Sequence, residues 1–382
     1  MKHFICIAVV LFSFVGYQQA AEVLPIVLKG HTNPIYFAVF SPDGKTILTA
    51  CRDHATNMTV RIWDTETGTE LRQLGGFTIN SAVFSADGTK VITCSGSNTV
   101  PIWDAESGKV LQELEGHIDR ITSARFSPDG KKVLTGSADK TVRMWDAESG
   151  KELWKIEGHT PLDSAGEFSP AGKMVITSSA DNVVQVRTFR IWDTDSGKEL
   201  QKFKEQGSQP RFAVFSPDEK KIVIASQIGL SMFGIATYDD KVAKIWDAES
   251  GKVLQKLEGH TDGVLCAFFS PDSKKIITSS IDNTARIWDA ETGKELQKLE
   301  GYVDMGLLAV FSSNGRKVLA RGLSKSSIRV WDAESGKELQ IFHPFGNLHD
   351  ISPDGRKAVT IGWNRDDNII AKIWDLEQSS PP

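Results

Sequence analysis

The chain has 382 residues, a formal net charge of −5 and a pI near 6.0, so it lacks the basic surface that nucleic-acid binding requires. Hydrophobic residues make up 40% and charged residues 24% of the sequence, which is typical of a folded globular protein. No CxxC, HExxH, GxSxG or phosphate-loop pattern occurs. We therefore expect no metal, no cofactor and no catalytic centre.

Residues 1–20 have the pattern of a secretory signal peptide. Two weakly basic residues precede an apolar run at 4–15, and polar and small residues follow it. This run is too short to span a bilayer, which needs about 20 apolar residues. We therefore expect cleavage near Ala20 or Ala21 and a mature chain in the periplasm or outside the cell.

Trp-Asp pairs recur along the rest of the chain. Successive pairs are 40 to 54 residues apart, at or above the period of about 40 to 45 residues of a repeat that forms one four-stranded propeller blade. Between them the same order returns: Gly-His, an apolar run, Ser-Pro-Asp-Gly, a second run, Ser-x-Asp and a third run. The runs predict short strands and the Pro-Asp-Gly segments predict tight turns. The pairs are Trp63-Asp64, Trp103-Asp104, Trp145-Asp146, Trp192-Asp193, Trp246-Asp247, Trp288-Asp289, Trp331-Asp332 and Trp374-Asp375.

This pattern resembles the WD-repeat family over residues 30–375. The resemblance implies an all-β, eight-bladed β-propeller of four-stranded antiparallel blades in a single domain. The tail that follows the last pair, residues 376–382, is too short and polar to supply the outer strand of blade eight. Residues 22–28 supply it in our prediction, because the segment 23–31 aligns with 253–260. The N-terminal strand would then pair with the C-terminal blade and close the ring.

The family pattern also implies a buried hydrogen-bond relay in each complete blade, from Asp through His and Ser to the indole N–H of Trp. A buried indole or imidazole without a partner costs about 1–3 kcal/mol, which is an independent reason to expect one. In four blades another residue replaces His, and we expect their Trp to be held by packing: Phe77, Gln206, Tyr302 and Phe345. Blade one has His31, Asp53 and Trp63, with Cys51 at the Ser position. The complete sets are Asp139, His117, Ser137 and Trp145 in blade three; Asp181, His159, Ser179 and Trp192 in blade four; and Asp282, His260, Ser280 and Trp288 in blade six.

Three cysteines follow the signal peptide: Cys51, Cys94 and Cys266. Cys51 and Cys94 fall on the second strands of adjacent blades, so a disulfide between them is one alternative. Buried free thiols are the other, and the one that we favour.

Loop lengths divide the predicted ring into two unlike faces. In a propeller, the turns after the first and third strands lie on one face, and the loops after the second and fourth strands lie on the other. The first set is short, uniform and carries interleaved charges. The second set is lengthened in blades one, four, five and eight, which predicts two raised walls on opposite sides of the channel mouth. The lengthened loops are residues 52–58, 181–188, 227–240 and 363–368.

Aromatic, apolar and arginine side chains in the second set are residue types that anchor protein interfaces. The main hypothesis is a monomeric, non-catalytic platform that binds another protein or a peptide on this face. The loop candidates are Leu230, Met232, Phe233, Tyr238, Trp363 and Arg365; alternatively, Met232 and Phe233 fold back onto the rim. The candidates at the channel mouth are Tyr36, Arg120, Thr122, Leu162, Arg211, Leu265 and Leu307.

Two other functions stay open. The segment 146–154 is similar to the docking turn of exported, eight-bladed quinoprotein dehydrogenases, in which Trp follows Gly in most blades. Here Trp follows Gly-Lys only at Trp154, which disfavours an oxidoreductase. Exposed loop aromatics would also suit a binder of cell-envelope glycans.

Overall fold

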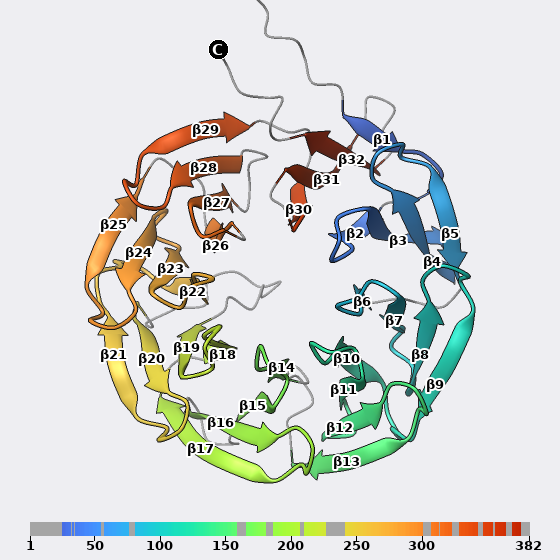
Figure 1. Ribbon diagram of the computed structural model, residues 1–382, viewed down its shortest axis with the longest axis horizontal. Helices are drawn as coiled ribbons and strands as arrows, with labels where there is room; N and C mark the ends of the chain where they lie inside the picture. Colours follow the sequence, from blue (N-terminus) through green and yellow to red (C-terminus); the bar gives the residue numbers. More distant parts are fainter. Residues whose placement is uncertain are drawn as a thin grey trace, which may run out of the picture.

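The chain forms a closed ring of eight blades, each a sheet of four antiparallel strands (Figure 1). The all-β, eight-bladed prediction is confirmed. No helix that could cross a membrane occurs in the part of the chain described below. The computed structural model describes residues 25–31, 33, 35–54, 57–75, 81–158, 166–180, 186–206, 210–226, 241–300, 307–312, 314–322, 328–342, 347–353, 356–363 and 369–375.

Blades one to seven each use four consecutive strands, ordered from the central channel outward. The strands of blades one to four are β2 (Ile35–Phe40), β3 (Thr46–His54), β4 (Asn57–Asp64) and β5 (Glu70–Leu74); β6 (Ser81–Phe84), β7 (Lys90–Cys94), β8 (Thr99–Asp104) and β9 (Val110–Glu115); β10 (Ile121–Phe126), β11 (Lys132–Ser137), β12 (Thr141–Asp146) and β13 (Glu152–Glu157); and β14 (Glu167–Phe168), β15 (Met174–Ala180), β16 (Val186–Asp193) and β17 (Glu199–Gln206).

The strands of blades five to eight are β18 (Pro210–Phe215), β19 (Lys221–Ser226), β20 (Ala243–Asp247) and β21 (Val253–Leu257); β22 (Val264–Phe269), β23 (Lys275–Ser280), β24 (Ala285–Asp289) and β25 (Glu295–Leu299); β26 (Leu307–Phe311), β27 (Lys317–Gly322), β28 (Ile328–Asp332) and β29 (Glu338–Phe342); and β30 (Asn347–Ile351), β31 (Lys357–Trp363), β32 (Ile369–Asp375) and β1 (Ile26–Leu28).

Blade eight therefore combines strands from both ends of the sequence. Strand β1 runs antiparallel to β32, with Ile26 opposite Ile373 and Leu28 opposite Ala371. The closure of the ring by an N-terminal strand agrees with the sequence prediction. Residues 1–24 and 376–382, to which the signal peptide and the tail were assigned, lie outside the described residues.

The hydrophobic core is divided among the interfaces between adjacent blades. In each described cluster, the Trp of one blade packs against the sheet of the preceding blade, as Trp288 does against Val223 and Ile245. Trp63 of blade one packs in the same way against Val359 of blade eight. The interface that closes the ring is thus built like the others.

A side chain on the fourth strand also joins each of several blades to the next. Gln112 Nε2 donates to the carbonyl of Glu148 at 2.7 Å, and Gln201, Gln255 and Gln297 repeat this bond to Glu249, Glu291 and Glu334. Trp154 occupies the equivalent position, and its Nε1 donates to the carbonyl of Thr194 at 2.9 Å. The segment that is similar to a quinoprotein docking turn therefore makes a joint that glutamine makes in other blades.

Candidate functional site

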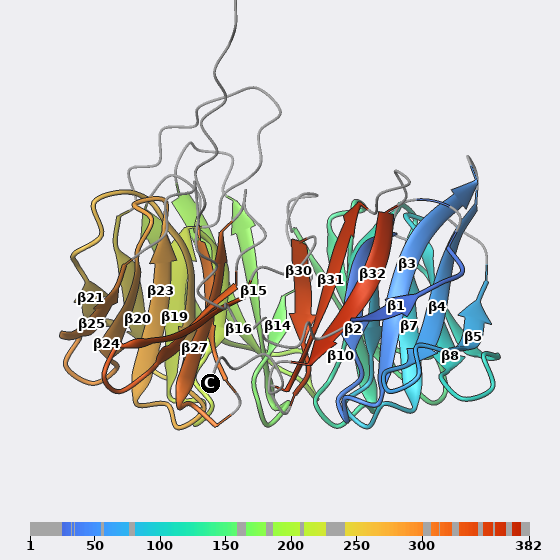
Figure 2. The same ribbon diagram turned by 90° about the horizontal axis from the view of Figure 1, so that it is seen from above.

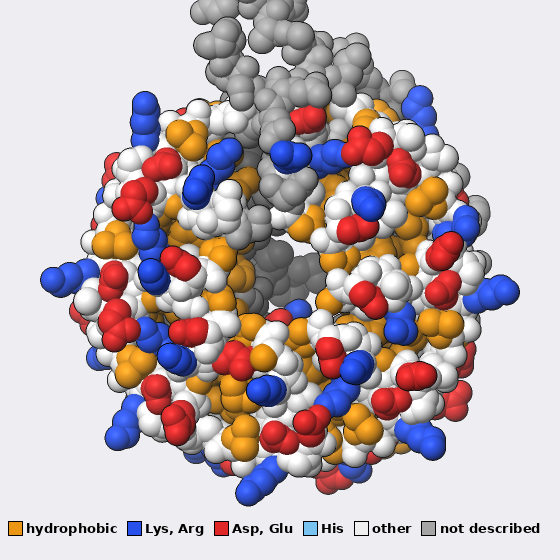
Figure 3. Space-filling view, viewed as in Figure 1, with side chains coloured by type: hydrophobic (Ala, Val, Ile, Leu, Met, Phe, Trp, Pro, Cys, Tyr) orange, Lys and Arg blue, Asp and Glu red, His pale blue; other side chains and the backbone are white. Residues whose placement is uncertain are grey.

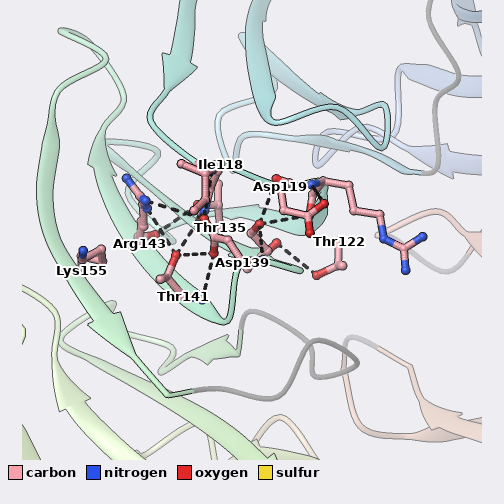
Figure 4. Close-up of polar contacts among 12 residues, drawn as sticks. Ile118, Asp119, Thr122, Thr135, Asp139, Thr141, Arg143 and Lys155 are labelled. Carbon is pink, nitrogen blue, oxygen red and sulfur yellow. Dashed lines mark hydrogen bonds and ion pairs between the residues drawn. The ribbon is translucent and has the colours of Figure 1, made fainter.

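Figure 4 shows polar contacts in blade three, where the Trp-Asp repeat is complete. The Trp145 indole Nε1 donates to Thr135 Oγ1 at 2.8 Å, and the same oxygen lies 2.8 Å from His117 Nε2. His117 Nδ1 lies 2.8 Å from Asp139 Oδ2. Because a carboxylate only accepts, Nδ1 carries the proton, and the Thr135 hydroxyl donates to Nε2 of a neutral ring. The buried relay therefore runs from Trp through Thr and His to Asp.

The predicted place of serine in this relay is wrong. Ser137 Oγ donates to the carbonyls of Asp119 and Arg120 at 3.0 and 3.1 Å, and accepts from the Asp139 N–H. It therefore ties the loop before the first strand to the turn after the second. In blade six, Ser280 Oγ likewise donates to the carbonyl of Asp262 and accepts from the Asp282 N–H, and the relay hydroxyl is that of Thr278.

Blade one shows the same division of roles. Thr49 Oγ1 lies 2.6 Å from Trp63 Nε1 and 2.7 Å from His31 Nε2. Cys51 stands outside this chain of bonds, and its thiol donates to the carbonyl of Asn33, as Ser137 does in blade three. The side chain of Asp53 lies outside the described residues.

Blades without the histidine keep part of the relay. The expectation that packing alone holds their Trp is wrong for Trp103, which donates to Thr93 at 3.0 Å, and for Trp374, which donates to Thr360 at 2.8 Å. Trp246 follows the expectation: its buried Nε1 has no hydrogen-bond partner among the described residues, and its ring stacks on Phe203 at 4.8 Å. The register places apolar Ile224 at the threonine position. The replacements at the His position, Phe77, Tyr302, Phe345 and the side chain of Gln206, lie outside the described residues.

Blade four departs from blade three although its Ser-x-Asp spacing is the same. Its β15–β16 ladder continues through Ser179 and Ala180, where blade three has already turned. Ser179 Oγ accepts from Arg190 Nη1 at 2.8 Å, so the full transfer of the predicted set to blade four is wrong at this serine. Trp192 donates to Thr177. Asp181 and His159 lie outside the described residues.

The charges of the blade-three relay are fixed by burial and hydrogen bonds. Burial lowers the pKa of His117 below its ordinary value, although Asp139 acts in the opposite direction. Burial raises the pKa of Asp139, but hydrogen bonds from Thr141 and His117 more than offset it, and the net pKa is lowered. A neutral imidazole against a carboxylate is a structural pair. Among the described residues no cluster of metal-ligating side chains occurs.

The two faces of the ring carry different connections between strands. Of the loops predicted to be lengthened, residues 55–56, 181–185, 227–240 and 364–368 lie outside the described residues. We call the face with the Ser-Pro-Asp-Gly and Asp-Ala-Glu-Ser-Gly-Lys turns the turn face, and the opposite one the loop face. Figure 3 shows the turn face, where acidic and basic side chains alternate around the rim. Short Asx turns recur there; the Asp146 carboxylate, for example, accepts from the Ser149 N–H at 2.7 Å.

On the loop face, the described strands are longer in three of the hairpins than in the others. In blade one, β3 and β4 have 9 and 8 residues; in blade four, β15 and β16 have 7 and 8; and in blade eight, β31 and β32 have 7 each. Second and third strands of the other blades have 5 or 6. Blades one and eight lie across the ring from blade four. Figure 2 shows the ring from the side, with the end of β3 at its upper edge.

The candidate contact residues that the structure describes differ in their exposure to solvent. Tyr36 is 45% exposed and Arg120 is exposed, whereas Thr122 is half-buried and donates to the Gly136 carbonyl at 3.0 Å. Leu265 is only 8% exposed, so its assignment as a contact residue is wrong. Outside the described residues lie Leu162, Leu230, Met232, Phe233, Tyr238 and Arg365, together with the side chains of Arg211, Leu307 and Trp363.

Cys51, Cys94 and Cys266 are buried, free thiols, so the disulfide alternative is wrong. Burial raises the pKa of the Cys94 thiol to about 11. Thiols of this kind are inert in the folded state.

Comparison with known proteins agrees with this geometry. The family model "WD domain, G-beta repeat" matches five segments that together cover just over half of the chain: residues 23–64, 68–104, 108–146, 150–193 and 251–289. No curated protein matches. Among solved structures, the chain is similar to a crystal structure of the computationally designed Ika8 protein, with a TM-score of 0.69 and 24% identity over 92% of this chain and 98% of that one. At that identity the likeness shows the fold alone, and the chain belongs, by its repeats, to the WD-repeat family.

Proposed function

We propose that this propeller is a non-catalytic platform, located outside the cytoplasm, that binds another protein on its loop face. The observation that carries the proposal is the length of the hairpins in blades one, four and eight, which extend a rigid ring on one face only. Long loops on a rigid scaffold are common positions for binding residues, because the scaffold fixes them at little entropic cost.

The remaining features of the ring support a structural part for the histidines and tryptophans. The relay histidines His117 and His260 are buried and bonded to Asp139 and Asp282, so they are not available as bases or ligands. Trp follows Gly-Lys only at Trp154, and glutamine makes the equivalent joint in other blades, which disfavours a quinone enzyme. The location outside the cytoplasm rests on the signal-peptide pattern of residues 1–20.

Cross-linking of the exported protein in its native cell envelope, followed by mass spectrometry, tests the face directly. Lysines report on both faces: Lys140 lies in a loop-face turn, and Lys131 and Lys151 lie in turns of the opposite face of the same blade. We expect partner cross-links at Lys140 and at the other loop-face lysines. Cross-links confined to Lys131, Lys151 and their equivalents would contradict the proposal, as would recovery of glycans in place of protein. Cell fractionation with an antibody against the mature chain tests the location.

A second experiment tests the lengthened loops. Phe233 and Trp363 are replaced together by Ala, and the partner recovered by affinity capture is compared with that of the unaltered protein. We expect the partner to be lost. A partner set that is unchanged would count against these two loops.

A further inference from the structure

Blades three and six are built on the same frame, which makes one a control for the other. Both have the relay with His–Asp distances of 2.8 Å. In both, the relay carboxylate accepts from the backbone N–H that follows His, at 3.2 Å from Ile118 and 3.0 Å from Thr261. Asp119 and Asp262 each accept from the next N–H at 2.7 Å. The backbone and its supporting side chains are therefore equivalent.

Three loop-face side chains differ between these equivalent blades. Blade three has Ile118, Arg120 and Lys140 where blade six has Thr261, Gly263 and Asn283. Blade six forms the same frame without them, so the frame does not require an isoleucine or two cations at these positions. Ile118 is 86% exposed, the highest value among the large hydrophobic side chains of the described residues. Single exposed hydrophobics are common, but the loop that carries Ile118 also carries Arg120 and is bonded to the turn that carries Lys140, and the fold equally does without these two charges.

The conformation of Lys140 strengthens this argument. Lys140 has a φ of 68° and Asn283 a φ of 63°, both in the left-handed region. Among non-glycine residues, asparagine adopts this region most readily, whereas a longer side chain gains nothing from it. Lysine therefore occupies a position where the backbone favours asparagine. Its positive charge is the property that asparagine could not supply there.

The loop that displays these side chains is held by hydrogen bonds. Figure 4 shows Ile118 and Asp119 close to Asp139. The Ala138 N–H donates to the Arg120 carbonyl at 2.9 Å, and the Ile121 N–H donates to the Ser97 carbonyl of blade two at 2.7 Å. A ligand that contacts this loop has little backbone entropy to remove, which favours affinity.

We propose that Ile118, Arg120 and Lys140, which we name the blade-three patch, bind an acidic segment of the partner protein. The segment places an apolar side chain against Ile118 and carboxylates near Arg120 and Lys140. This inference rests on the proposed function, since it names the chemistry of what the loop face binds. Charge complementarity supports it: Arg120 and Lys140 are both exposed, and among the described residues neither side chain forms an ion pair.

Fluorescence anisotropy with labelled synthetic peptides tests the patch. The probe is a nonapeptide that repeats Glu-Glu-Leu, and the comparison peptides repeat Glu-Glu-Ser and Lys-Lys-Leu. The variant I118T/R120G/K140N carries blade-six residues at all three positions, so its melting temperature should match that of the unaltered protein. The control variant K131N/K151N removes two positive charges from the turn face of the same blade.

We expect the Glu-Glu-Leu peptide to bind the unaltered protein and the control variant equally, and the triple variant about ten-fold more weakly, as for an interface anchor. The Glu-Glu-Ser peptide should bind more weakly and the Lys-Lys-Leu peptide not at all. Equal binding by the triple variant, equal weakening in the control variant, or no preference for the acidic peptide would each overturn the inference, as would absence of any binding.

Cross-linking the triple variant in the cell envelope separates this inference from the proposed function. If the partner still cross-links to the remaining loop-face lysines of the triple variant as efficiently as to the same lysines of the unaltered protein, the platform stands and the patch is wrong. If the partner cross-links only to the turn face, the proposed function itself fails.

Discussion

The indole nitrogen of Trp145 lies 2.8 Å from the hydroxyl oxygen of Thr135. The same hydroxyl lies 2.8 Å from His117 Nε2, so one threonine is the partner of two buried rings. Its position, two residues before Ser137, recurs as Thr49, Thr93, Thr177, Thr278 and Thr360. In these six blades the Trp of the repeat is thus fixed by a threonine on the second strand of its own blade.

Replacing Thr135 by Val should be among the costlier single changes in blade three. The change keeps the shape of the side chain but leaves the Trp145 N–H and the His117 ring without their partner, and each buried orphan costs about 1–3 kcal/mol. The midpoint of urea unfolding should fall clearly. Thr135→Ser retains the hydroxyl, so it should lower the midpoint less. Ser137→Ala should also lower the midpoint less than Thr135→Val does. A larger decrease for Ser137→Ala than for Thr135→Val would indicate that the serine is part of the relay.

Trp246 should tolerate replacement by Phe better than Trp145 does. Both changes remove part of a buried ring, but Trp246→Phe also removes an N–H that has no acceptor in the described part of the chain, whereas Trp145→Phe removes a hydrogen bond. The difference in unfolding free energy should be about 1–2 kcal/mol. Denaturant unfolding of both variants measures it, and equal losses would contradict the contrast between the two blades.

Closure of the ring should depend on Leu28. Its side chain is 1% exposed and lies in the cluster between blades one and eight. Leu28→Ala should cost about 2–5 kcal/mol, as for other buried leucines. Leu71→Ala is a matched control, because Leu71 also lies on an outermost strand but is 40% exposed. Deleting residues 21–28 should lower the melting temperature sharply, and an unchanged melt would refute closure by this strand.

The blade-three relay should make the fold less stable in acid. The pKa of His117 is lowered in the folded state, so stability is complete above the unfolded value of about 6.5 and decreases as the pH falls below it. Asp139, whose pKa is also lowered, adds a further loss below about 3.8. His117→Asn should reduce the slope of the unfolding midpoint between pH 6.5 and 5, as estimated from these reference values. A slope equal to that of the unaltered protein would show that His117 does not contribute.

The three described cysteines should not react with thiol reagents in the folded protein. Cys51, Cys94 and Cys266 are buried, and burial raises the pKa of Cys94 to about 11. Ellman's reagent should therefore label none of them in native protein and all three in urea. Reducing agent should leave the melting temperature unchanged, and a decrease would indicate a disulfide.

The repeat determined the blade number and the closing strand from sequence, because the Trp-Asp interval and the alignment of Leu28 with Leu257 both report on whole strands. The hydroxyl of the relay could not be assigned in this way. Thr135 and Ser137 are two residues apart on one strand, so their side chains point to the same face of the sheet. Only the structure shows that the Trp145 indole reaches Thr135, which is paired with Arg143 in the strand register. The spacing of the motif residues also did not predict the difference in blade four, where the β15–β16 ladder continues past Ser179 although the Ser-x-Asp motif is unchanged.

The blade-three patch was missed for a related reason. Arg120 was a candidate because it follows Gly-His, but Ile118 and Lys140 acquire meaning only when blade three is compared with blade six in space. The sequence signal was available in the aligned repeats, as Ile against Thr and Lys against Asn. The aligned sequences do not show that Ile118 is exposed or that Lys140 has a positive φ, and these two facts come from the structure.

The pairing of β1 with β32 has a mechanical consequence. The register places the beginning of β1 opposite the end of β32, so the chain enters and leaves blade eight at the same end of one strand pair. Tension between the two ends of the chain therefore peels this pair apart one hydrogen bond at a time and opens the ring at low force. A load applied to the loop face acts instead along strands that are each bonded to neighbours, and the ring resists it as a unit.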